Sequence, residues 1–269
     1  MSRIVVVTSG KGGVGKTTTS ASISVGLAKL GKKTVVIDFD IGLRNLDLVM
    51  GCERRVVYDF VNVLNNDISI DQALIKDKRI DNLYILPASQ TRDKSVLTKD
   101  SVNKVFKKLS DMNFEFIICD SPAGIENGAI ISIYFADDAI IVANPEISSV
   151  RDSDRMLGII SSTSKRSETG EKPILEHLIL TRYDQKRVDC GQMLSLDDIL
   201  DILKIPIIGI IPEDSSILNA SNKGIPIILE KNSISGRSYK DTVKRFLGEK
   251  IPIKIYKKEK SFLKWLFWR

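Results

Sequence analysis

Apolar positions along the 269-residue chain form short runs that alternate with amphipathic stretches. Most of the runs are continuous Val, Ile and Leu, which is typical of strands buried on both faces of a sheet. The stretches between them have helical spacing, and Gly31 follows the first of them as a helix-ending residue. The predicted strands are 4–7, 34–37, 83–86, 116–119, 139–142, 178–180 and 207–211, and the predicted helices are 16–30, 98–111, 127–135, 149–164, 195–203 and 237–247.

This alternation predicts an α/β fold with a mostly parallel sheet and helices on both faces. We expect one domain over residues 1–250, a linker at 251–256 that contains Pro252, and a separate tail at 257–269. In sheets of this kind the ligand binds beyond the carboxyl ends of the strands. The functional residues are therefore expected at that edge.

The composition narrows the function mainly by what it excludes. The chain is 43% hydrophobic and 28% charged, which fits a folded core and excludes a collagen-like or disordered protein. Its three cysteines are far apart, so neither a disulfide framework nor a zinc cluster is expected, and a reducing compartment is favoured. The one histidine, His177, is predicted to be a surface or strand-edge residue with no role as ligand or base. We expect no signal peptide and no membrane-spanning helix.

The net charge of +6 is unevenly distributed. Residues 257–269 hold five basic groups and one acid, so the preceding 256 residues carry only +2. The basic character therefore belongs to the tail, and we expect no general or specific nucleic-acid binding by the body of the protein.

The segment after the first predicted strand, residues 10–17, matches the phosphate-binding pattern G-x-x-x-x-G-K-[ST]. Its glycines let backbone N–H groups approach phosphate oxygens, and the following helix directs its positive end to the same place. Lys16 is expected to neutralise phosphate charge, and the Thr17 hydroxyl is expected to ligate Mg²⁺. The pattern predicts a P-loop nucleoside triphosphatase. Lys11 is a second lysine in this loop, and it is either solvated or directed at a nucleotide bound by a second copy of the chain.

Three carboxylates follow two of the predicted strands at the same edge. Asp38 and Asp40 follow strand 34–37, and Asp120 follows strand 116–119. Carboxylates at this place can ligate Mg²⁺ directly or through water, and one of the first two could orient an attacking water. The N-K-x-D pattern of GTPases is absent from the sequence, so adenine is favoured as the base.

Together these motifs resemble the ParA/MinD family of deviant Walker A ATPases. The resemblance is carried by loop 10–17 with its extra lysine and by residues 37–45, 120–124 and 211–214, and it extends over the whole chain from Ser2. It implies an ATPase that forms a homodimer with ATP and binds an anionic membrane surface, so that the protein is cytoplasmic and peripheral on the cytoplasmic face of the inner membrane. It also implies that the dimer recruits the division inhibitor MinC and is released by MinE, thereby placing the septum.

The resemblance assigns catalytic and metal-binding roles to individual residues. Lys11 would reach the nucleotide of the partner subunit, and Lys16 would hold phosphate. Asp40 would position the attacking water, while Asp38 and Asp120 would support the Mg²⁺ that Thr17 binds.

Further residues are implied in binding. Arg44, Asn45, Asp152 and Asp154 match surfaces that contact the second subunit or a partner protein. The residues implied to bind the nucleotide are Gly10, Lys11, Gly12, Gly13, Val14, Gly15, Lys16, Thr17, Thr18, Arg182, Pro212 and Asp214.

The tail is predicted to form an amphipathic helix that lies in a membrane interface. At ~100° per residue its apolar side chains fall within an arc of roughly 200°, with lysines on the other side, although Trp268 breaks a clean separation. The residues expected to enter the membrane are Phe262, Leu263, Trp265, Leu266 and Phe267.

Three other functions fit parts of the pattern. The alternative within the family is a ParA-like DNA-partition ATPase, which needs a basic body and gives the aromatic tail no task. A metal-cluster carrier related to nitrogenase reductase needs paired interface cysteines. An adaptor that binds membranes and keeps its nucleotide as a structural element needs no ATP-dependent change in lipid binding.

Overall fold

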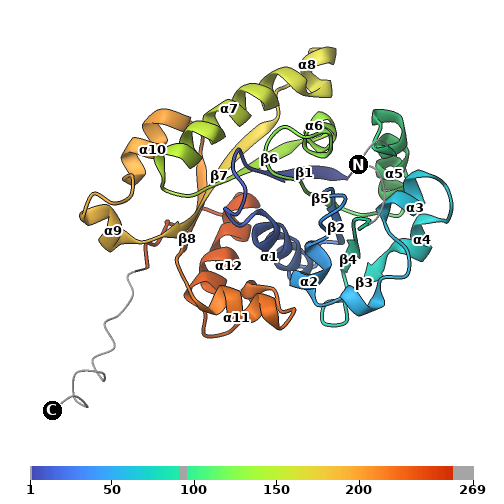
Figure 1. Ribbon diagram of the computed structural model, residues 1–269, viewed down its shortest axis with the longest axis horizontal. Helices are drawn as coiled ribbons and strands as arrows, with labels where there is room; N and C mark the ends of the chain where they lie inside the picture. The colour runs from blue at the N-terminus through green and yellow to red at the C-terminus, as the bar shows by residue number, and fades with distance from the viewer. Residues whose placement is uncertain (1, 91–95, 257–269) are drawn as a thin grey trace.

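In the described part of the chain, eight strands form one sheet in the order β3-β4-β2-β5-β1-β6-β7-β8 (Figure 1). The computed structural model describes residues 2–90 and 96–256. Every strand pair is parallel except β3–β4, which is antiparallel. The strands are β1 (Arg3–Thr8), β2 (Thr34–Asp38), β3 (Ile75–Lys76), β4 (Leu83–Leu86), β5 (Phe116–Asp120), β6 (Asp138–Ala143), β7 (Leu175–Tyr183) and β8 (Ile207–Pro212).

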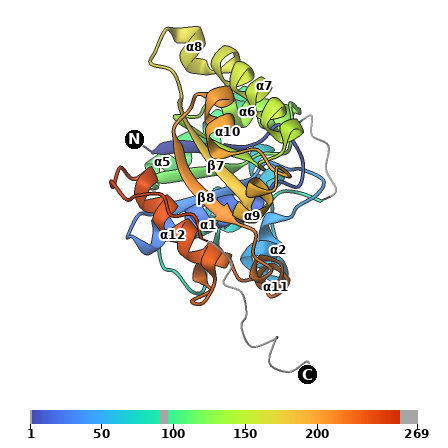
Figure 2. The ribbon, with the colours of Figure 1, turned by 90° about the vertical axis from the view of Figure 1, so that its left-hand side faces the viewer.

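Helices cover both faces of the sheet and give it two apolar cores. One core receives side chains of α1, α2, α11 and α12, and the other receives those of α3 to α7 and α10. The turned view shows these layers on opposite sides of β7 and β8 (Figure 2). The helices are α1 (Lys16–Lys29), α2 (Leu46–Met50), α3 (Phe60–Leu64), α4 (Ile70–Ala73), α5 (Lys99–Asp111), α6 (Asn127–Tyr134), α7 (Ile147–Thr163), α8 (Lys165–Thr169), α9 (Gln185–Asp189), α10 (Leu196–Leu203), α11 (Ser216–Asn222) and α12 (Ile234–Phe246).

The predicted sheet is confirmed. Each predicted strand is present and is extended by one or more residues, except 83–86, which has the predicted bounds. The two-residue strand β3 was not predicted, because two residues are too few to show an alternating pattern. The helices of four or five residues and the seven-residue α11 were also not predicted, because they are too short to show a clear helical period. Among the described residues, no helix is both long and apolar enough to cross a membrane.

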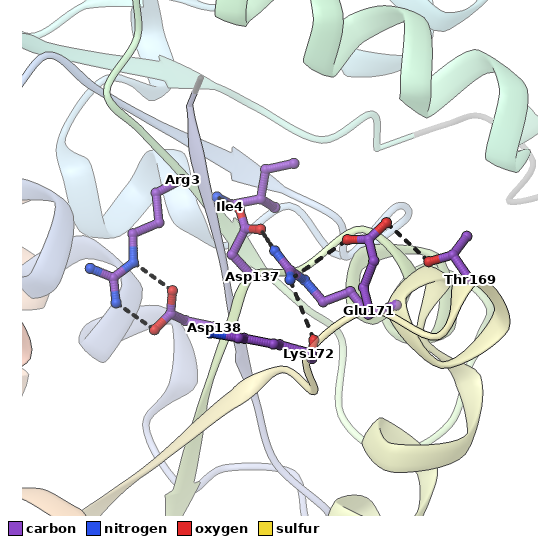
Figure 3. Close-up of polar contacts among 8 residues, drawn as sticks. Arg3, Ile4, Asp137, Asp138, Thr169, Glu171 and Lys172 are labelled. Atoms are coloured by element: carbon purple, nitrogen blue, oxygen red, sulfur yellow. Dashed lines mark hydrogen bonds and ion pairs between the residues drawn. The ribbon is translucent and has the colours of Figure 1, made fainter.

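The amino edge of the sheet, opposite the predicted site, is held by hydrogen bonds and ion pairs to Asp137 and to the buried Asp138 (Figure 3). Arg3 donates two hydrogen bonds of 2.6 Å to the carboxylate of Asp138, and the backbone N–H of Ile4 donates to Asp137. His177 also contacts Asp138, with 2.9 Å between Nε2 and Oδ1, and its ring packs edge-on against Phe246. The prediction that His177 is a surface or strand-edge residue was wrong, because β7 lies inside the sheet and the carboxylate of Asp138 gives the ring a polar partner.

The chain turns back after α12 at Gly248 and runs beside β8. Ile253 packs against the core on the α7 side, whereas α12 packs on the other face, so this segment passes from one layer to the other at the end of the sheet. The predicted linker 251–256 therefore contacts the body, and the boundaries at 250 and 256 stay predictions. The tail residues 257–269, including Phe262, Leu263, Trp265, Leu266 and Phe267, lie outside the described residues.

Candidate functional site

The predicted phosphate loop joins β1 to α1 at the carboxyl edge of the sheet. Gly13 and Gly15 have φ of 73° and 98°, a conformation that side chains with a Cβ rarely adopt. Gly10 faces the backbone of α7, where a Cβ would lie 2.2 Å from the carbonyl oxygen of Asp152. The loop therefore needs glycine for two reasons, backbone conformation at Gly13 and Gly15 and close packing at Gly10.

Lys16 opens α1 and is nearly buried, with 9% of its surface exposed. Its ammonium donates a hydrogen bond of 2.9 Å to the hydroxyl of Ser9. Burial lowers the pKa of Lys16, and the carboxylates of Asp120 and Asp40 partly oppose this effect. An anionic ligand in the loop would supply the counter-charge that this ammonium needs.

Asp38 and Asp120 form the acidic part of the site. They are paired across β2 and β5 and are 1% and 2% exposed. Burial, reinforced by the charge of Asp120, raises the pKa of Asp38 well above its ordinary value. Burial also raises the pKa of Asp120 to about 6, although hydrogen bonds from Ser20 and Thr17 oppose it.

This arrangement fits a divalent cation. The charge of Asp120 raises the pKa of the buried Asp38, an effect that a cation beside the pair would offset, and oxygen ligands from Asp and Thr are those that Mg²⁺ prefers. Asp120 interacts with the Thr17 side chain in the loop, so the predicted metal residues are adjacent. Asp40 is half-buried at the same edge, and its backbone N–H donates 2.9 Å to Asp38.

Lys11 lies on the outer side of the loop. Its ammonium donates to Glu146 at 3.0 Å and to Ser148 at 3.1 Å, and 41% of its side chain is exposed. Both partners belong to the start of α7. Because an exposed ion pair of this kind is worth less than about 1 kcal/mol, Lys11 can leave these partners at small cost.

A cavity of about 500 Å³ adjoins the loop beside β7 and β8. Three of the predicted nucleotide residues, Thr18, Arg182 and Asp214, line this cavity, and Pro212 lines a smaller one next to it. Arg182 has a φ of 54°, and its guanidinium donates 2.7 Å to the carbonyl of Gly13. The Arg182 side chain therefore contacts both the cavity and the phosphate loop.

Comparison with known proteins identifies the family. A protein-family model described as an AAA domain matches residues 2–172. The chain is 66% identical over 268 residues to the septum site-determining protein MinD of Escherichia coli strain K12, covering 99% of both chains. The chain belongs to the MinD family.

Two solved structures agree with this MinD-family assignment. The structure of a MinC:MinD cell division protein complex from Aquifex aeolicus is 43% identical with a TM-score of 0.84, over 95% of this chain and 100% of that chain. MinD from Pyrococcus horikoshii, complexed with Mg-ADP, is 28% identical with a TM-score of 0.79, over 93% and 100% of the two chains. The predicted family and P-loop fold are confirmed.

The residues implied in partner contacts lie on two surfaces of this MinD-family chain. Arg44 and Asn45 precede α2, and Asn45 is exposed. The guanidinium of Arg44 is instead largely buried and donates 2.6 Å to the buried carboxylate of Asp47. Asp152 and Asp154 lie on α7, with Asp154 exposed and Asp152 half-buried against the loop.

Several residues that contact the phosphate loop or Asp120 were not predicted. Ser20 donates 2.7 Å to Asp120, and Thr181 donates 2.6 Å to the carbonyl of Val14. Ser20 lies one helical turn after Lys16, which is a spacing the sequence contains. Thr181 and Glu146 come near the loop only through the order of strands, so no local pattern could have indicated them.

Proposed function

We propose that the chain is a Mg²⁺-dependent ATP hydrolase that dimerises with ATP and takes part in choosing the site of the division septum. The observation that carries this proposal is the constellation at the carboxyl edge: the buried Lys16 in the phosphate loop, with Asp38 and Asp120 paired behind Thr17. The relative from Escherichia coli is a septum site-determining protein, which supports the proposed role in choosing the septum site. ATP and Mg²⁺ are its cofactors.

The residues of the site divide the chemical work. Lys16 and the loop N–H groups hold the phosphates, and Thr17 with Asp120 would hold Mg²⁺, supported by Asp38. The bound cation would neutralise phosphate charge as it develops. Asp40 would accept a hydrogen bond from water and orient it for attack. Arg182, Asp214 and Pro212 would surround the adenine.

Lys11 would complete the site of a second subunit. Its present partners, Glu146 and Ser148, are exposed and hold it weakly, so a phosphate of the partner's nucleotide can replace them. This exchange would link ATP binding to dimer formation. Asp152 follows on the same helix, and its backbone touches the loop at Gly10, so α7 would respond to the same event.

We further propose that the dimer recruits MinC and is released by MinE. The solved relative from Aquifex aeolicus is a MinC:MinD complex, which supports MinC as a partner. The exposed parts of Asn45 and Asp154 are the surfaces we assign to partner contacts. Arg44 would act mainly by holding the loop before α2 through its bond to Asp47.

Membrane binding is assigned to residues 257–269. Each basic group near an anionic surface contributes about 1 kcal/mol, whereas ordering the backbone costs about 1–2 kcal/mol per residue. One short tail should therefore bind weakly. Two tails on one dimer gain roughly 10²–10⁴ in apparent affinity, which makes lipid binding follow ATP. The protein would accordingly be cytoplasmic and peripheral at the cytoplasmic face of the inner membrane.

Sedimentation with anionic vesicles tests this function. The full chain should sediment with ATP and Mg²⁺ and much less with ADP, and a chain ending at Tyr256 should remain in solution. Equal sedimentation with both nucleotides would contradict the ATP-dependent cycle and favour an adaptor. A DNA duplex added as competitor should not reduce sedimentation, and if it does, the DNA-partition alternative gains support.

A further inference from the structure

The segment that leads from α12 to the tail is fixed to the body by one arginine. Arg245 donates 2.8 Å to the carbonyl of Ile251, 2.6 Å to that of Ile208 at the start of β8, and 3.2 Å to that of Pro252. Burial lowers the pKa of Arg245. Three carbonyls from two segments therefore share one guanidinium, which holds residues 251–252 beside the first part of the edge strand.

Tyr256 fixes the other end of this segment. Its side chain lines a cavity of about 90 Å³ together with residues at the ends of β7 and β8, among them Tyr183, Asp184 and Glu213. The guanidinium of Arg237, in the first turn of α12, lies 5.7 Å from the centre of the Tyr256 ring. The chain therefore runs the length of β8 and reaches the carboxyl edge of the sheet.

This end point lies next to the nucleotide site. Glu213 lines both the cavity of Tyr256 and the larger cavity that contains Arg182 and Asp214. Residue 257, the first residue of the tail, follows Tyr256 directly. The origin of the tail is thus at the edge where Lys11 and the phosphate loop lie.

We propose that Tyr256, seated between the ends of β7 and β8 and against Arg237, is a positioning residue that fixes the point from which the membrane tail leaves the ATPase body. The inference rests on the proposed membrane function. If Tyr256 loses these contacts, the chain is held to the body only as far as Ile251 and Pro252, which Arg245 binds. The tether, meaning the stretch between the last held residue and the membrane-binding residues, then becomes longer. A longer flexible tether lowers the effective concentration of the second tail roughly as the −3/2 power of its length. The residues before Phe262 would then number nine (253–261) in place of five (257–261), which weakens two-tail binding by about 2.4-fold.

The experiment compares full-length variants on vesicles that contain phosphatidylglycerol, with ATP and Mg²⁺. Tyr256→Ala should weaken binding about two- to threefold, and Tyr256→Phe should bind as the parent does, because the aromatic ring and not the hydroxyl occupies this position. Ile255→Ala is the matched control, since Ile255 is a neighbouring apolar residue that is 37% exposed, and it should bind as the parent does. ATP hydrolysis without lipid should be unchanged in Ile255→Ala.

A second pair of variants separates anchoring from direct contact of Tyr256 with lipid. Arg237→Ala removes the stacking partner, which lies outside the tail, and should weaken binding as Tyr256→Ala does. Lys240→Ala removes an equal charge from the exposed side of the same helix and should have a smaller effect. Equal losses from Arg237→Ala and Lys240→Ala would show that only charge matters and would overturn the proposal.

Hydrogen exchange without lipid makes the proposal independent of membrane binding. Amides of residues 250–256 should exchange faster in Tyr256→Ala than in the parent or in Ile255→Ala. If the parent fails to bind vesicles but this exchange difference is present, the proposed membrane function is wrong while the anchor stands. If the parent binds and the exchange of Tyr256→Ala is unchanged, the anchor is wrong.

Discussion

Asp38 and Asp120 are paired residues at the carboxyl ends of the adjacent parallel strands β2 and β5, and both carboxylates are buried. Burial raises the pKa of both acids, because a buried carboxylate loses the water that would stabilise its charge, and the charge of Asp120 raises the pKa of Asp38 further. Burying two carboxylates side by side is unfavourable, and this pair lies at the position where a P-loop ATPase needs a divalent cation. The pair therefore connects the strand order of the sheet to the chemistry of the site.

The first prediction concerns pH. The pKa of Asp120 is about 6 in the folded chain and 3.8 for the ordinary group, so the folded state holds its proton more tightly than the unfolded state. The contribution of Asp120 to stability should fall as pH rises between these values, by on the order of 2 kcal/mol. Denaturant unfolding of the nucleotide-free protein measures this against Asp120→Asn, which lacks the titration. Binding of Mg²⁺ and nucleotide should reduce the pH dependence of the stability difference between the parent and Asp120→Asn. A parent that gains stability relative to Asp120→Asn as pH rises would contradict the assignment.

The second prediction concerns the packing of the phosphate loop. Gly10→Ala should lower stability by about 1–3 kcal/mol and weaken nucleotide binding, because its Cβ would meet the carbonyl of Asp152 at 2.2 Å. Gly12→Ala is the control for stability, since the nearest atom to its Cβ would be 3.9 Å away. Thermal unfolding and calorimetric titration with ADP measure the two effects. Equal melting temperatures for both variants would refute the close contact.

The third prediction concerns Lys11. Lys11→Ala should bind ADP nearly as the parent does but should not form a dimer with ATP, as measured by light scattering during size-exclusion chromatography. Lys32→Ala is a matched control, because Lys32 makes an exposed ion pair with Glu115 at the same 3.0 Å and with the same 41% exposure. Loss of ADP binding in Lys11→Ala would show that the lysine serves its own subunit.

The fourth prediction concerns Asp214, which accepts hydrogen bonds from the N–H groups of Ser216 and Ser235 and from the hydroxyl of Ser233. Burial raises its pKa, but these bonds outweigh that effect and lower it. Asp214→Ala should cost about 1.5–3 kcal/mol, whereas the exposed neighbour in Glu213→Ala should cost little.

The pH dependence of the stability difference between the parent and Asp214→Ala tests whether the carboxylate charge causes this loss. Because the folded pKa of Asp214 is lowered, its contribution is present above the ordinary pKa and is lost as pH falls through the folded value. The stability gap between the parent and Asp214→Ala, measured by denaturant unfolding, should therefore narrow in acid. A gap that stays constant down to pH 2 would show that the carboxylate charge is not involved.

The sequence indicated the sheet and the phosphate site because both depend on local patterns. Continuous apolar runs marked the strands, and the loop from Gly10 to Thr17 contains its own glycines, lysine and threonine within eight residues. Asp38 and Asp120 could be placed together because parallel strands end at one edge. Membership of a known family then connected these residues to one activity.

The remaining features depend on contacts between distant segments. Nothing near Lys11 in the sequence shows that Glu146 holds it, 135 residues away. The inward position of Arg44 follows from the buried carboxylate of Asp47, and the partner of His177 is Asp138 on a neighbouring strand. Such pairs are fixed by strand order and packing, which a linear pattern does not contain.

The run of residues 251–256 beside β8 has a consequence for truncated proteins. β8 is the last strand of the sheet, and unpaired backbone groups on an edge strand can pair with another chain. A fragment cut after Phe246 would lose the segment that lies beside this edge strand, together with the tail, and we expect it to self-associate more readily without ATP. Its association without ATP would be mistaken for the ATP-dependent dimer in an assay of dimer formation. A fragment cut after Tyr256 keeps residues 251–256 and avoids this error.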